Sequence, residues 1–302
     1  MASRNFYEAE GLAVDLGGTK VAAARVKNGQ VVETVREDTD TEAGVSDQVE
    51  AICRLLDRLD VSPEDRIGVA VAGRVNRDGE WFAVNSEILT RIDRVPLRTL
   101  LADRLGRDVM VQNDALAAAV GEFVAGAGKG CRSMAYVTVS TGVGGGIVLD
   151  GCPVTSPSGL AGHMGFTTSR NATGRCGSGR TGTVESIASG RAIAAKAATE
   201  GHPGLDGKQV FEAHLAGAPW AREIVQESAS AIAELCANLK TLLDLDRIVL
   251  GGGIGLAASY LDLVKEALLQ EPQMFRPELR IAALGTSSAM IGILAQGPGQ
   301  GE

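Results

Sequence analysis

Asn113 and Asp114 form the first group in this sequence that could do chemistry. They follow a strand-like run, Val109 to Gln112, and precede an alanine-rich stretch, Ala115 to Phe123, that predicts a helix. Polar residues at the carboxyl end of a parallel strand lie where α/β sheets bind their ligands. A carboxylate at such a position could accept a proton from a substrate hydroxyl as a general base. The alternative is that Asn113 or Asp114 only caps the helix.

Three glycine-rich groups could bind phosphate through their backbone. Each follows an apolar run, and they comprise Asp15 to Lys20, Ser140 to Gly146 and Gly251 to Gly255. Backbone N–H groups approach an anion closely where no side chain stands in the way. Glycine also weakens helices and flat strands, so we expect turns at all three places, including the whole of Thr141 to Gly146. A tight hairpin for the second group and close helix–strand packing for the third are the alternatives.

The elements that would hold these groups are a series of strands and helices. The predicted strands cover residues 12–14, 21–26, 67–72, 109–112, 134–139, 147–149, 247–250 and 281–283. The predicted helices cover residues 47–59, 115–123, 187–199, 221–243, 256–269 and 287–295. A strand, a glycine turn, a second strand and a second turn occur at 12–29 and again at 134–151. We therefore expect an α/β protein with two related lobes that hold one phosphate chain from opposite sides.

Composition argues against several other classes of protein. The chain has 302 residues, 45% of them hydrophobic, which is enough for one large domain or two medium ones. Its formal net charge is −8, whereas a surface that binds nucleic acid or anionic membranes needs an excess of positive charge. Its five cysteines are odd in number and scattered, so they predict no disulfide framework. No signal-like or membrane-spanning apolar run occurs, and we expect a cytoplasmic protein with no nucleic-acid or membrane partner.

Three segments carry a resemblance to a known family. They read Ser-Thr-Gly-Val-Gly-Gly-Gly at residues 140–146, Gly-Leu-Ala-Gly-His at 159–163 and Gly-Arg-Val-Asn at 73–76. With the glycine groups and the Asn-Asp pair, they are similar to the sugar kinases of the repressor, open-reading-frame and kinase (ROK) family, over residues 12–295. The first two segments resemble the bacterial members that phosphorylate N-acetylmannosamine. The third resembles the N-acetylhexosamine-binding turn of vertebrate members with that activity.

The resemblance implies a fold and an oligomeric state. The family has the two-lobed, duplicated actin-like ATPase fold, which is ribonuclease H-like, and each lobe is a mixed sheet flanked by helices. We expect an N-terminal lobe at residues 1–119, joined by a C-terminal helix at 285–302, and a C-terminal lobe at 120–284. The resemblance also implies a homodimer.

The resemblance assigns roles to individual residues. Asp114 corresponds to the general base and Asn113 to a sugar ligand. The other positions that line the sugar are Gly73, Arg74, Asn85, Ser86, His163 and Glu185. The positions that bind ATP are Asp15, Gly17, Gly18, Thr19 and Lys20 in the first phosphate loop, Thr141 and Gly142 in the second, and Gly252 at the adenosine turn. Mg²⁺ would act with ATP, and the helix start next to Asp114 would keep that carboxylate ionised.

A structural zinc is the family feature from which this sequence departs. The family binds it through one histidine and the three cysteines of Cys-x-Cys-Gly-x-x-Gly-Cys-x-Glu. Here Cys176 remains, while Ser178 and Thr183 replace the other two cysteines. The family histidine lies ten residues before the first cysteine, at the position of Phe166, so His163 corresponds instead to a sugar-binding position. Because hydroxyl groups are poor zinc ligands, we predict no structural zinc, with Phe166 packing where the metal lies in the family.

The implied function is ATP-dependent phosphorylation of N-acetylmannosamine at its C6 hydroxyl, giving N-acetylmannosamine 6-phosphate in sialic-acid breakdown. The main alternative is a glucokinase or another hexose or N-acetylhexosamine kinase of the family, which His163 disfavours because many glucokinases carry glutamate at that position. A sugar-responsive repressor is disfavoured because residues 1–11 are too few for a helix-turn-helix domain. A sugar-binding regulator without catalysis is disfavoured because it would not need Asp114.

Overall fold

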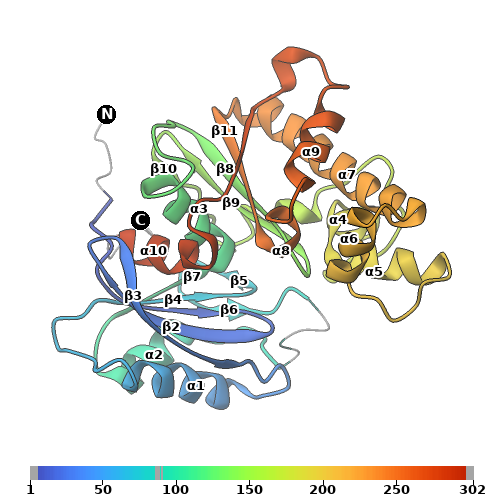
Figure 1. Ribbon diagram of the computed structural model, residues 1–302. Coiled ribbons are helices and arrows are strands. Elements are labelled where there is room, and N and C mark those ends of the chain that lie inside the picture. Colours follow the sequence, from blue (N-terminus) through green and yellow to red (C-terminus); the bar gives the residue numbers. More distant parts are fainter. Residues whose placement is uncertain (1–5, 86–88, 90, 297–302) are drawn as a thin grey trace. The chain divides into compact units, whose positions relative to one another are not determined.

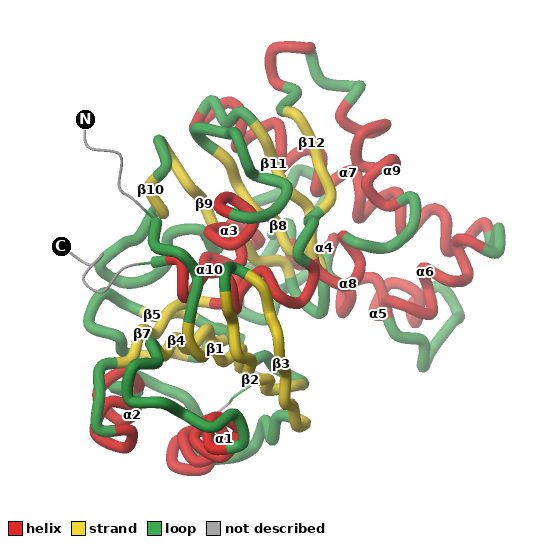
Figure 2. The backbone as a smooth tube through the Cα atoms, turned by 60° about the vertical axis from the view of Figure 1, so that its left-hand side comes forward, coloured by secondary structure: helices red, strands yellow, loops and turns green. Residues whose placement is uncertain are grey.

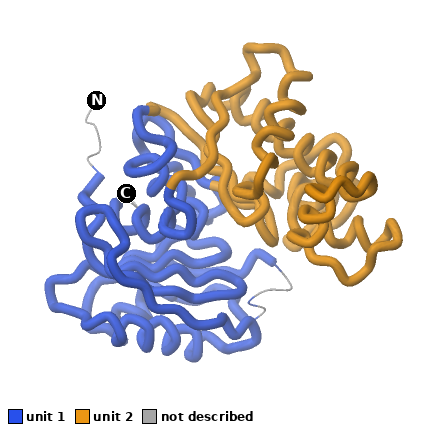
Figure 3. Tube along the Cα trace, viewed as in Figure 1, with its two compact units in different colours: residues 1–130, 146–162, 284–302 blue, residues 131–145, 163–283 orange. Residues whose placement is uncertain are grey.

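The computed structural model describes residues 6–85, 89 and 91–296, which form two compact units (Figure 3). Unit 1 comprises the described chain up to Gly130, residues 146–162 and the chain from Leu284 onward. Unit 2 comprises residues 131–145 and 163–283. No helix in these described ranges is both long enough and apolar enough to cross a membrane.

Unit 1 is built on a five-stranded mixed sheet in the order β3-β2-β1-β4-β7. Its strands are β1 (Gly11–Leu16), β2 (Lys20–Lys27), β3 (Gln30–Asp38), β4 (Ile67–Val71) and β7 (Val109–Asn113). β2 pairs antiparallel with β1 and β3, whereas β1, β4 and β7 run parallel. Parallel strands end at the same edge of a sheet, so Asp15 near the end of β1 and Asn113 at the end of β7 lie at one edge.

Helices cover both faces of this sheet (Figures 1 and 2). Helices α1 (Val45–Asp57) and α2 (Leu97–Leu105) cover one face, and α3 (Asp114–Val124) and α10 (Ser288–Ala295) cover the other. Unit 1 also contains a short two-stranded ribbon, β5 (Arg74–Val75) and β6 (Trp81–Phe82), the 3-10 turn η3 (Gly285–Ser287) and the part of the second sheet, described below, that falls within residues 146–162.

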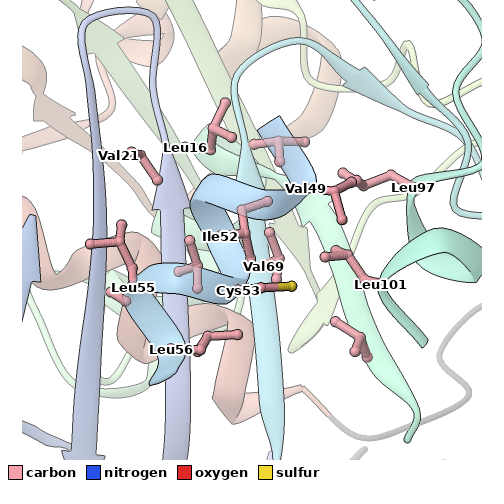
Figure 4. Close-up of a cluster of buried hydrophobic side chains, with 14 of the residues drawn as sticks. Leu16, Val21, Val49, Ile52, Cys53, Leu55, Leu56, Val69, Leu97 and Leu101 are labelled. Carbon is pink, nitrogen blue, oxygen red and sulfur yellow. The ribbon is translucent and has the colours of Figure 1, made fainter. Parts of the chain in front are cut away.

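The hydrophobic core of unit 1 includes a cluster between α1 and the sheet (Figure 4). Apolar residues recur along α1 every three or four positions, at Val49, Ile52 and Leu56, so one face of the helix is apolar. That face packs against Val69 of β4, with Leu101 of α2 in the same cluster. Each fully buried aliphatic side chain contributes roughly 1.5–3 kcal/mol. This packing fixes the strands whose ends carry Asp15 and Asn113.

The second sheet repeats the plan of the first, in the order β10-β9-β8-β11-β12. Its strands are β8 (Met134–Val139), β9 (Val143–Leu149), β10 (Cys152–Pro153), β11 (Arg247–Gly251) and β12 (Glu278–Ile281). β9 and β10 are antiparallel, whereas β11 runs parallel to both β8 and β12. The two sheets thus share one strand order, which confirms the predicted α/β fold with two mixed sheets.

Helices also pack around the strands of unit 2 (Figure 1). They are α4 (Glu185–Ala188), α5 (Gly190–Thr199), α6 (Gly207–Leu215), α7 (Pro219–Leu243), α8 (Gly252–Gly255) and α9 (Tyr260–Leu268), with the 3-10 turns η1 (Met164–Phe166) and η2 (Gln273–Phe275). The long helix α7 packs against α4, α5, α6 and α9. These four shorter helices of the unit therefore all pack on α7.

Several observed bounds differ from the predicted ones. The predicted helix 187–199 is two helices, because Ser189 caps α5 by accepting a hydrogen bond from Ala192 N at 3.1 Å. The predicted helix 256–269 begins only at Tyr260, and the predicted strand 281–283 lies at 278–281. Strand β3 was not predicted, because its side chains are largely exposed and do not alternate cleanly between apolar and polar.

The compact units also differ from the predicted lobes. The boundary predicted after residue 119 falls inside α3, all of which belongs to unit 1. The reason is close packing of α3 against α10: a Cβ atom on Gly121 would lie 2.0 Å from the carbonyl oxygen of Ser288. Residues 146–162 belong to unit 1 as well. Unit 1 is therefore larger than the N-terminal lobe expected from the resemblance.

Candidate active site

Asn113 caps helix α3 at the carboxyl end of β7. Its Oδ1 accepts a hydrogen bond from Leu116 N at 2.9 Å, and its Nδ2 donates to the carbonyl oxygen of Gly73 at 2.7 Å. The same Nδ2 donates to Oδ1 of Asp114 at 2.9 Å, and that oxygen also accepts from Ala115 N at 2.8 Å. The cap is thus Asn113, so capping does not explain the presence of Asp114. The hydrogen bonds from Asn113 Nδ2 and Ala115 N orient the Asp114 carboxylate.

The carboxyl groups of Asp15 and Asp114 interact electrostatically in unit 1. Burial raises the pKa of Asp114 to about 6, although the hydrogen bonds from Ala115 and Asn113 lower it. Burial and the charge of Asp114 together raise the pKa of Asp15 to about 7. The helix start therefore acts on Asp114 in the expected direction, but burial outweighs it. A general base with a pKa near the working pH suits proton transfer.

The first predicted phosphate loop is the tight turn that joins β1 to β2. Gly17 N donates to the carbonyl oxygen of Lys20 at 2.9 Å, which closes the turn. The hydroxyl of Thr39 donates to the carbonyl oxygen of Gly17 at 2.9 Å and Thr39 N donates to that of Thr19 at 3.0 Å. Thr19 and Lys20 are exposed, and Gly18 is half-buried. The turn is therefore held by its neighbours and leaves its tip accessible to a ligand.

The second glycine group is only partly a turn, which corrects the prediction. Ser140, Thr141 and Gly142 form the turn, while Gly144 to Gly146 lie inside strand β9. A Cβ on Gly145 would lie 2.6 Å from the carbonyl oxygen of Tyr136. Glycine in a strand interior marks a place where another part of the chain approaches closely, and this approach outweighs the low strand propensity of glycine.

Glu185 begins helix α4 and its carboxylate lies against the second phosphate loop. Its Oε2 accepts from Val143 N at 3.0 Å, and its Oε1 accepts from Gly177 N at 3.3 Å. The approach depends on Gly142, because a Cβ there would lie 2.6 Å from Oε2 of Glu185. Arg191 adds an ion pair at 3.8 Å. The structure thus brings a predicted sugar ligand and a predicted phosphate loop together within unit 2.

The third glycine group combines packing with an accessible tip. Gly251 and Gly252 pack closely on β8, since a Cβ on Gly252 would lie 2.5 Å from both Thr138 Oγ1 and the carbonyl oxygen of Val139. Gly253, by contrast, is exposed, and a Cβ there would approach no described atom closer than 3.8 Å. The packing interpretation therefore accounts for the first two glycines. Contact of this turn with adenosine stays a prediction.

The turn that carries Gly73 and Arg74 is fixed by protein contacts. Gly73 has a φ of +109°, and a Cβ there would lie 2.5 Å from the carbonyl oxygen of Phe82. The guanidinium of Arg74 lies 3.9 Å from the Phe82 ring centroid and donates to the carbonyl oxygen of Ser158. Asn85 is half-buried nearby in sequence, and Ser86 lies outside the described residues. The predicted contacts of these residues with sugar stay predictions.

His163 immediately precedes η1 in unit 2 and is half-buried. Its ring stacks on that of Phe166, with the ring centroids 5.8 Å apart and the planes 5° from parallel. Phe166 therefore supports the ring of His163. The role of His163 toward sugar stays a prediction.

Three of the predicted zinc-site positions, Cys176, Ser178 and Thr183, come together, but their chemistry does not suit zinc. Cys176 Sγ lies 3.0 Å from Ser178 Oγ. Burial raises the pKa of the Cys176 thiol, but hydrogen bonds with Ser178 and Thr183 outweigh burial and hold the pKa below its usual value. One thiol and two hydroxyls lack the thiolate and imidazole set of a structural zinc site. Among residues 6–85, 89 and 91–296, no group of three or more His, Cys, Asp or Glu side chains could hold a metal ion.

Two residues that support the site were missed in the sequence analysis. Thr39 braces the first phosphate loop from 22 residues away, and Glu234 of α7 binds the segment that leads to Glu185. Neither lies in a motif or near its partner in the sequence. No local signal could have found them.

Comparison with known proteins identifies the family. The sequence profile of the ROK family matches residues 11–296. This chain belongs to the ROK family. It is 40% identical to the N-acetylmannosamine kinase of Citrobacter koseri over 289 residues, covering 95% of this chain and 98% of that protein. It is 38% identical to the N-acetylmannosamine kinase of Haemophilus influenzae, covering 93% of each chain.

Solved structures of ROK proteins have the same fold. The ROK hexokinase of Thermus thermophilus superposes with a TM-score of 0.80 at 32% identity, covering 94% of this chain and 97% of that one. The ROK glucokinase of Streptomyces griseus, solved with glucose and AMPPNP, superposes with a TM-score of 0.79 at 29% identity and the same coverage. The predicted resemblance and the predicted ROK sugar-kinase fold are thereby confirmed.

Proposed function

We propose that this ROK protein is an ATP-dependent kinase that phosphorylates N-acetylmannosamine at its C6 hydroxyl, an ATP:N-acetylmannosamine 6-phosphotransferase. The observation that carries the proposal is Asp114: a carboxylate at a strand end, oriented by two hydrogen bonds, with a pKa of about 6. The choice of sugar rests on relatives at 38–40% identity that are named N-acetylmannosamine kinase. The reaction would contribute to sialic-acid breakdown.

In the proposed mechanism, Asp114 accepts the proton of the sugar hydroxyl as its oxygen attacks the γ-phosphorus of ATP. Oδ1 of Asp114 already accepts from Asn113 and Ala115, which leaves Oδ2 as the oxygen to receive the proton. Asn113 fixes the orientation of Asp114 and, from the same edge, is proposed to contact the sugar. His163 and Glu185 of unit 2 are the proposed sugar ligands on that unit.

ATP is proposed to bind with Mg²⁺ at the two phosphate loops. The first loop offers exposed Thr19 and Lys20, and the second offers exposed Ser140 and Thr141. Mg²⁺ prefers one or two carboxylates together with phosphate oxygens. Asp15 suits it, because a cation there would offset the cost of burying the charge beside Asp114. Mg²⁺ would neutralise charge on the transferred phosphoryl group.

The remaining proposals concern partners and location. We propose that the chain acts as a homodimer in the cytoplasm, binds sugar and ATP as small molecules, and has no nucleic-acid or membrane partner. The net charge of −8 supports the absence of a nucleic-acid surface. We also propose that it needs no structural zinc, because Ser178 and Thr183 replace thiol ligands.

A coupled assay with ATP and Mg²⁺ tests the proposal. The panel contains N-acetylmannosamine, N-acetylglucosamine, mannose and glucose, and we expect the highest kcat/KM for N-acetylmannosamine. A preference for glucose would reject the proposed substrate but keep the kinase and Asp114. No phosphorylation of any sugar would reject the kinase and favour a sugar-binding regulator.

A glucokinase or hexokinase is the second candidate function. The observation that favours it is the likeness to the Thermus thermophilus hexokinase at 32% identity and the Streptomyces griseus glucokinase at 29%. Against it stands the higher identity, 40%, to an N-acetylmannosamine kinase. The same sugar panel separates the two functions.

A further inference from the structure

Residues 167–184 form the irregular segment of unit 2 that leads from η1 to Glu185. The structure assigns them only isolated bridges, Thr168 with Thr183 and Arg175 with Thr181. The segment has turn-type backbone hydrogen bonds of its own, such as that from Cys176 N to the carbonyl oxygen of Arg180 at 2.8 Å. Because it contains no helix or regular strand, contacts with other elements decide how firmly it is held in unit 2. Because Glu185 follows directly, the order of this segment decides where the Glu185 carboxylate lies.

Glu234 of helix α7 provides an anchor for this segment. Its Oε2 accepts from the hydroxyl of Ser169 at 2.6 Å, and both of its carboxylate oxygens accept from Arg170 N, at 3.1 and 3.2 Å. The Arg170 side chain adds a weaker contact at 3.4 Å. The Ser169 residue is buried and 65 residues from Glu234 along the chain. Hydrogen bonds to a charged acceptor are about twice as strong as neutral ones.

The anchored end of the segment is hydrogen-bonded to the end that carries Glu185. Ser169 N donates to the carbonyl oxygen of Gly182 at 3.1 Å, and Val184 N donates to that of Thr167 at 2.9 Å. The two sides of this narrow hairpin are therefore bonded directly to each other. From within the hairpin, Gly177 N donates to Oε1 of Glu185 at 3.3 Å.

Helix α7 also holds the helix that Glu185 begins. The hydroxyl of Ser228, fully buried on α7, donates to the carbonyl oxygen of Ala188 at the end of α4 at 3.0 Å. α7 is thus bonded on both sides of Glu185, through Glu234 before it and Ser228 after it.

We propose that Glu234 is a positioning residue of this enzyme, whose carboxylate anchors residues 167–184 and so places Glu185 for sugar binding. The anchor consists of hydrogen bonds from Ser169 and Arg170 N and an ion pair with the Arg170 side chain, and the thiol–hydroxyl cluster of Cys176, Ser178 and Thr183 lies in the same segment. The sugar-binding part of this inference rests on the proposed function; the anchoring part does not.

Hydrogen–deuterium exchange on the full chain tests the anchoring. In Glu234→Ala, the amides of residues 169–184 should exchange about tenfold faster or more. The reason is that the segment loses its hydrogen bonds to the Glu234 carboxylate, so local opening becomes easier. In Glu234→Gln, which keeps the shape but accepts through one oxygen only, the increase should be smaller. The matched control is Glu223→Gln, an exposed glutamate of the same helix, which should leave exchange unchanged. Amides of β8 and β11 report whether unit 2 as a whole is intact.

Steady-state kinetics on the same variants test the positioning. Glu234→Ala should raise KM for the sugar about tenfold and leave KM for ATP within about twofold, with Glu234→Gln intermediate and Glu223→Gln like the parent. Unchanged exchange in residues 169–184 would overturn the inference, whatever the activity. Faster exchange with an unchanged sugar KM would reduce Glu234 to a structural role and overturn it as well. Faster exchange in a chain that phosphorylates no sugar would refute the proposed function while leaving the anchor in place.

Discussion

Asp114→Asn should make this protein more stable while it removes most of its activity. Burial raises the pKa of Asp114 from its ordinary value of 3.8 to about 6, so ionising this group costs more in the folded state than in the unfolded state. Two pKa units at about 1.4 kcal/mol each give a cost of about 3 kcal/mol at neutral pH. Asparagine carries no charge, and its Oδ1 can still accept the hydrogen bonds from Asn113 and Ala115.

The pH dependence of this gain follows from the sign of the shift. Below about pH 4, Asp114 is protonated in both the folded and the unfolded state, so the substitution should change the free energy of unfolding little. Between pH 4 and 6, the unfolded state releases its proton first and the parent loses stability relative to the variant. The difference should level off only above about pH 7, where both Asp114 and Asp15 are ionised in the folded parent. The variant should also bring the pKa of Asp15 down, because the charge of Asp114 helps to raise it.

Denaturant unfolding of the parent and the variant from pH 4.5 to 8 measures this difference. We expect roughly 1–3 kcal/mol in favour of the variant at pH 8 and much less at pH 4.5. Asp103→Asn, an exposed carboxylate on α2, is the control and should show no such trend. Turnover of Asp114→Asn should fall about 10²-fold or more with sugar affinity little changed. A variant less stable at pH 8, or one with normal turnover, would refute the assignment of Asp114 as a general base with a raised pKa.

Three further predictions test other parts of the structure. The kcat/KM of the parent should fall as the pH drops below about 6, where Asp114 becomes protonated, and a profile flat down to pH 5 would contradict this assignment. Gly145→Ala should lower the free energy of unfolding, measured by denaturant titration, by roughly 1–3 kcal/mol, because its Cβ would meet Tyr136 and Met164. The control, Gly253→Ala at an exposed turn, should change this free energy little. Glu122→Ala should cost at least about 2 kcal/mol in thermal or denaturant unfolding, since it removes a fully buried carboxylate that accepts three hydrogen bonds. A loss under about 0.5 kcal/mol would show that water replaces the carboxylate.

The fold was largely predictable because its signals are local. Apolar runs at residues 12–14, 67–72, 109–112, 134–139 and 247–250 became strands β1, β4, β7, β8 and β11, and the spacing of α1 predicted its buried face. Strand β3 and helix α2 gave weaker signals: β3 is largely exposed, and only Leu97 and Leu101 of α2 are buried. Elements that bury little apolar surface leave little pattern in the sequence.

The site was less predictable, because its geometry depends on contacts between distant residues. Residues Gly144 to Gly146 illustrate the reason: local propensity predicts a turn, but close packing makes them part of strand β9. The pKa of Asp114 is another case. The helix start that lowers this pKa is visible in the sequence, whereas the burial that raises it is not. Glu234, far from its partners in the sequence, gave no signal at all.

Glu185, a proposed sugar ligand, also holds the proposed phosphate loop of unit 2 against the hairpin of residues 167–184. Its two carboxylate oxygens accept from different segments, Val143 N next to the phosphate loop and Gly177 N in the hairpin. Gly142 must lack a side chain for this contact, since a Cβ there would meet Oε2 of Glu185. The glycine in this loop therefore makes room for a carboxylate of the protein. Under the proposed function, a sugar that draws Glu185 toward itself would compete with these two N–H groups, so sugar binding and the conformation of the phosphate loop would be linked through one side chain.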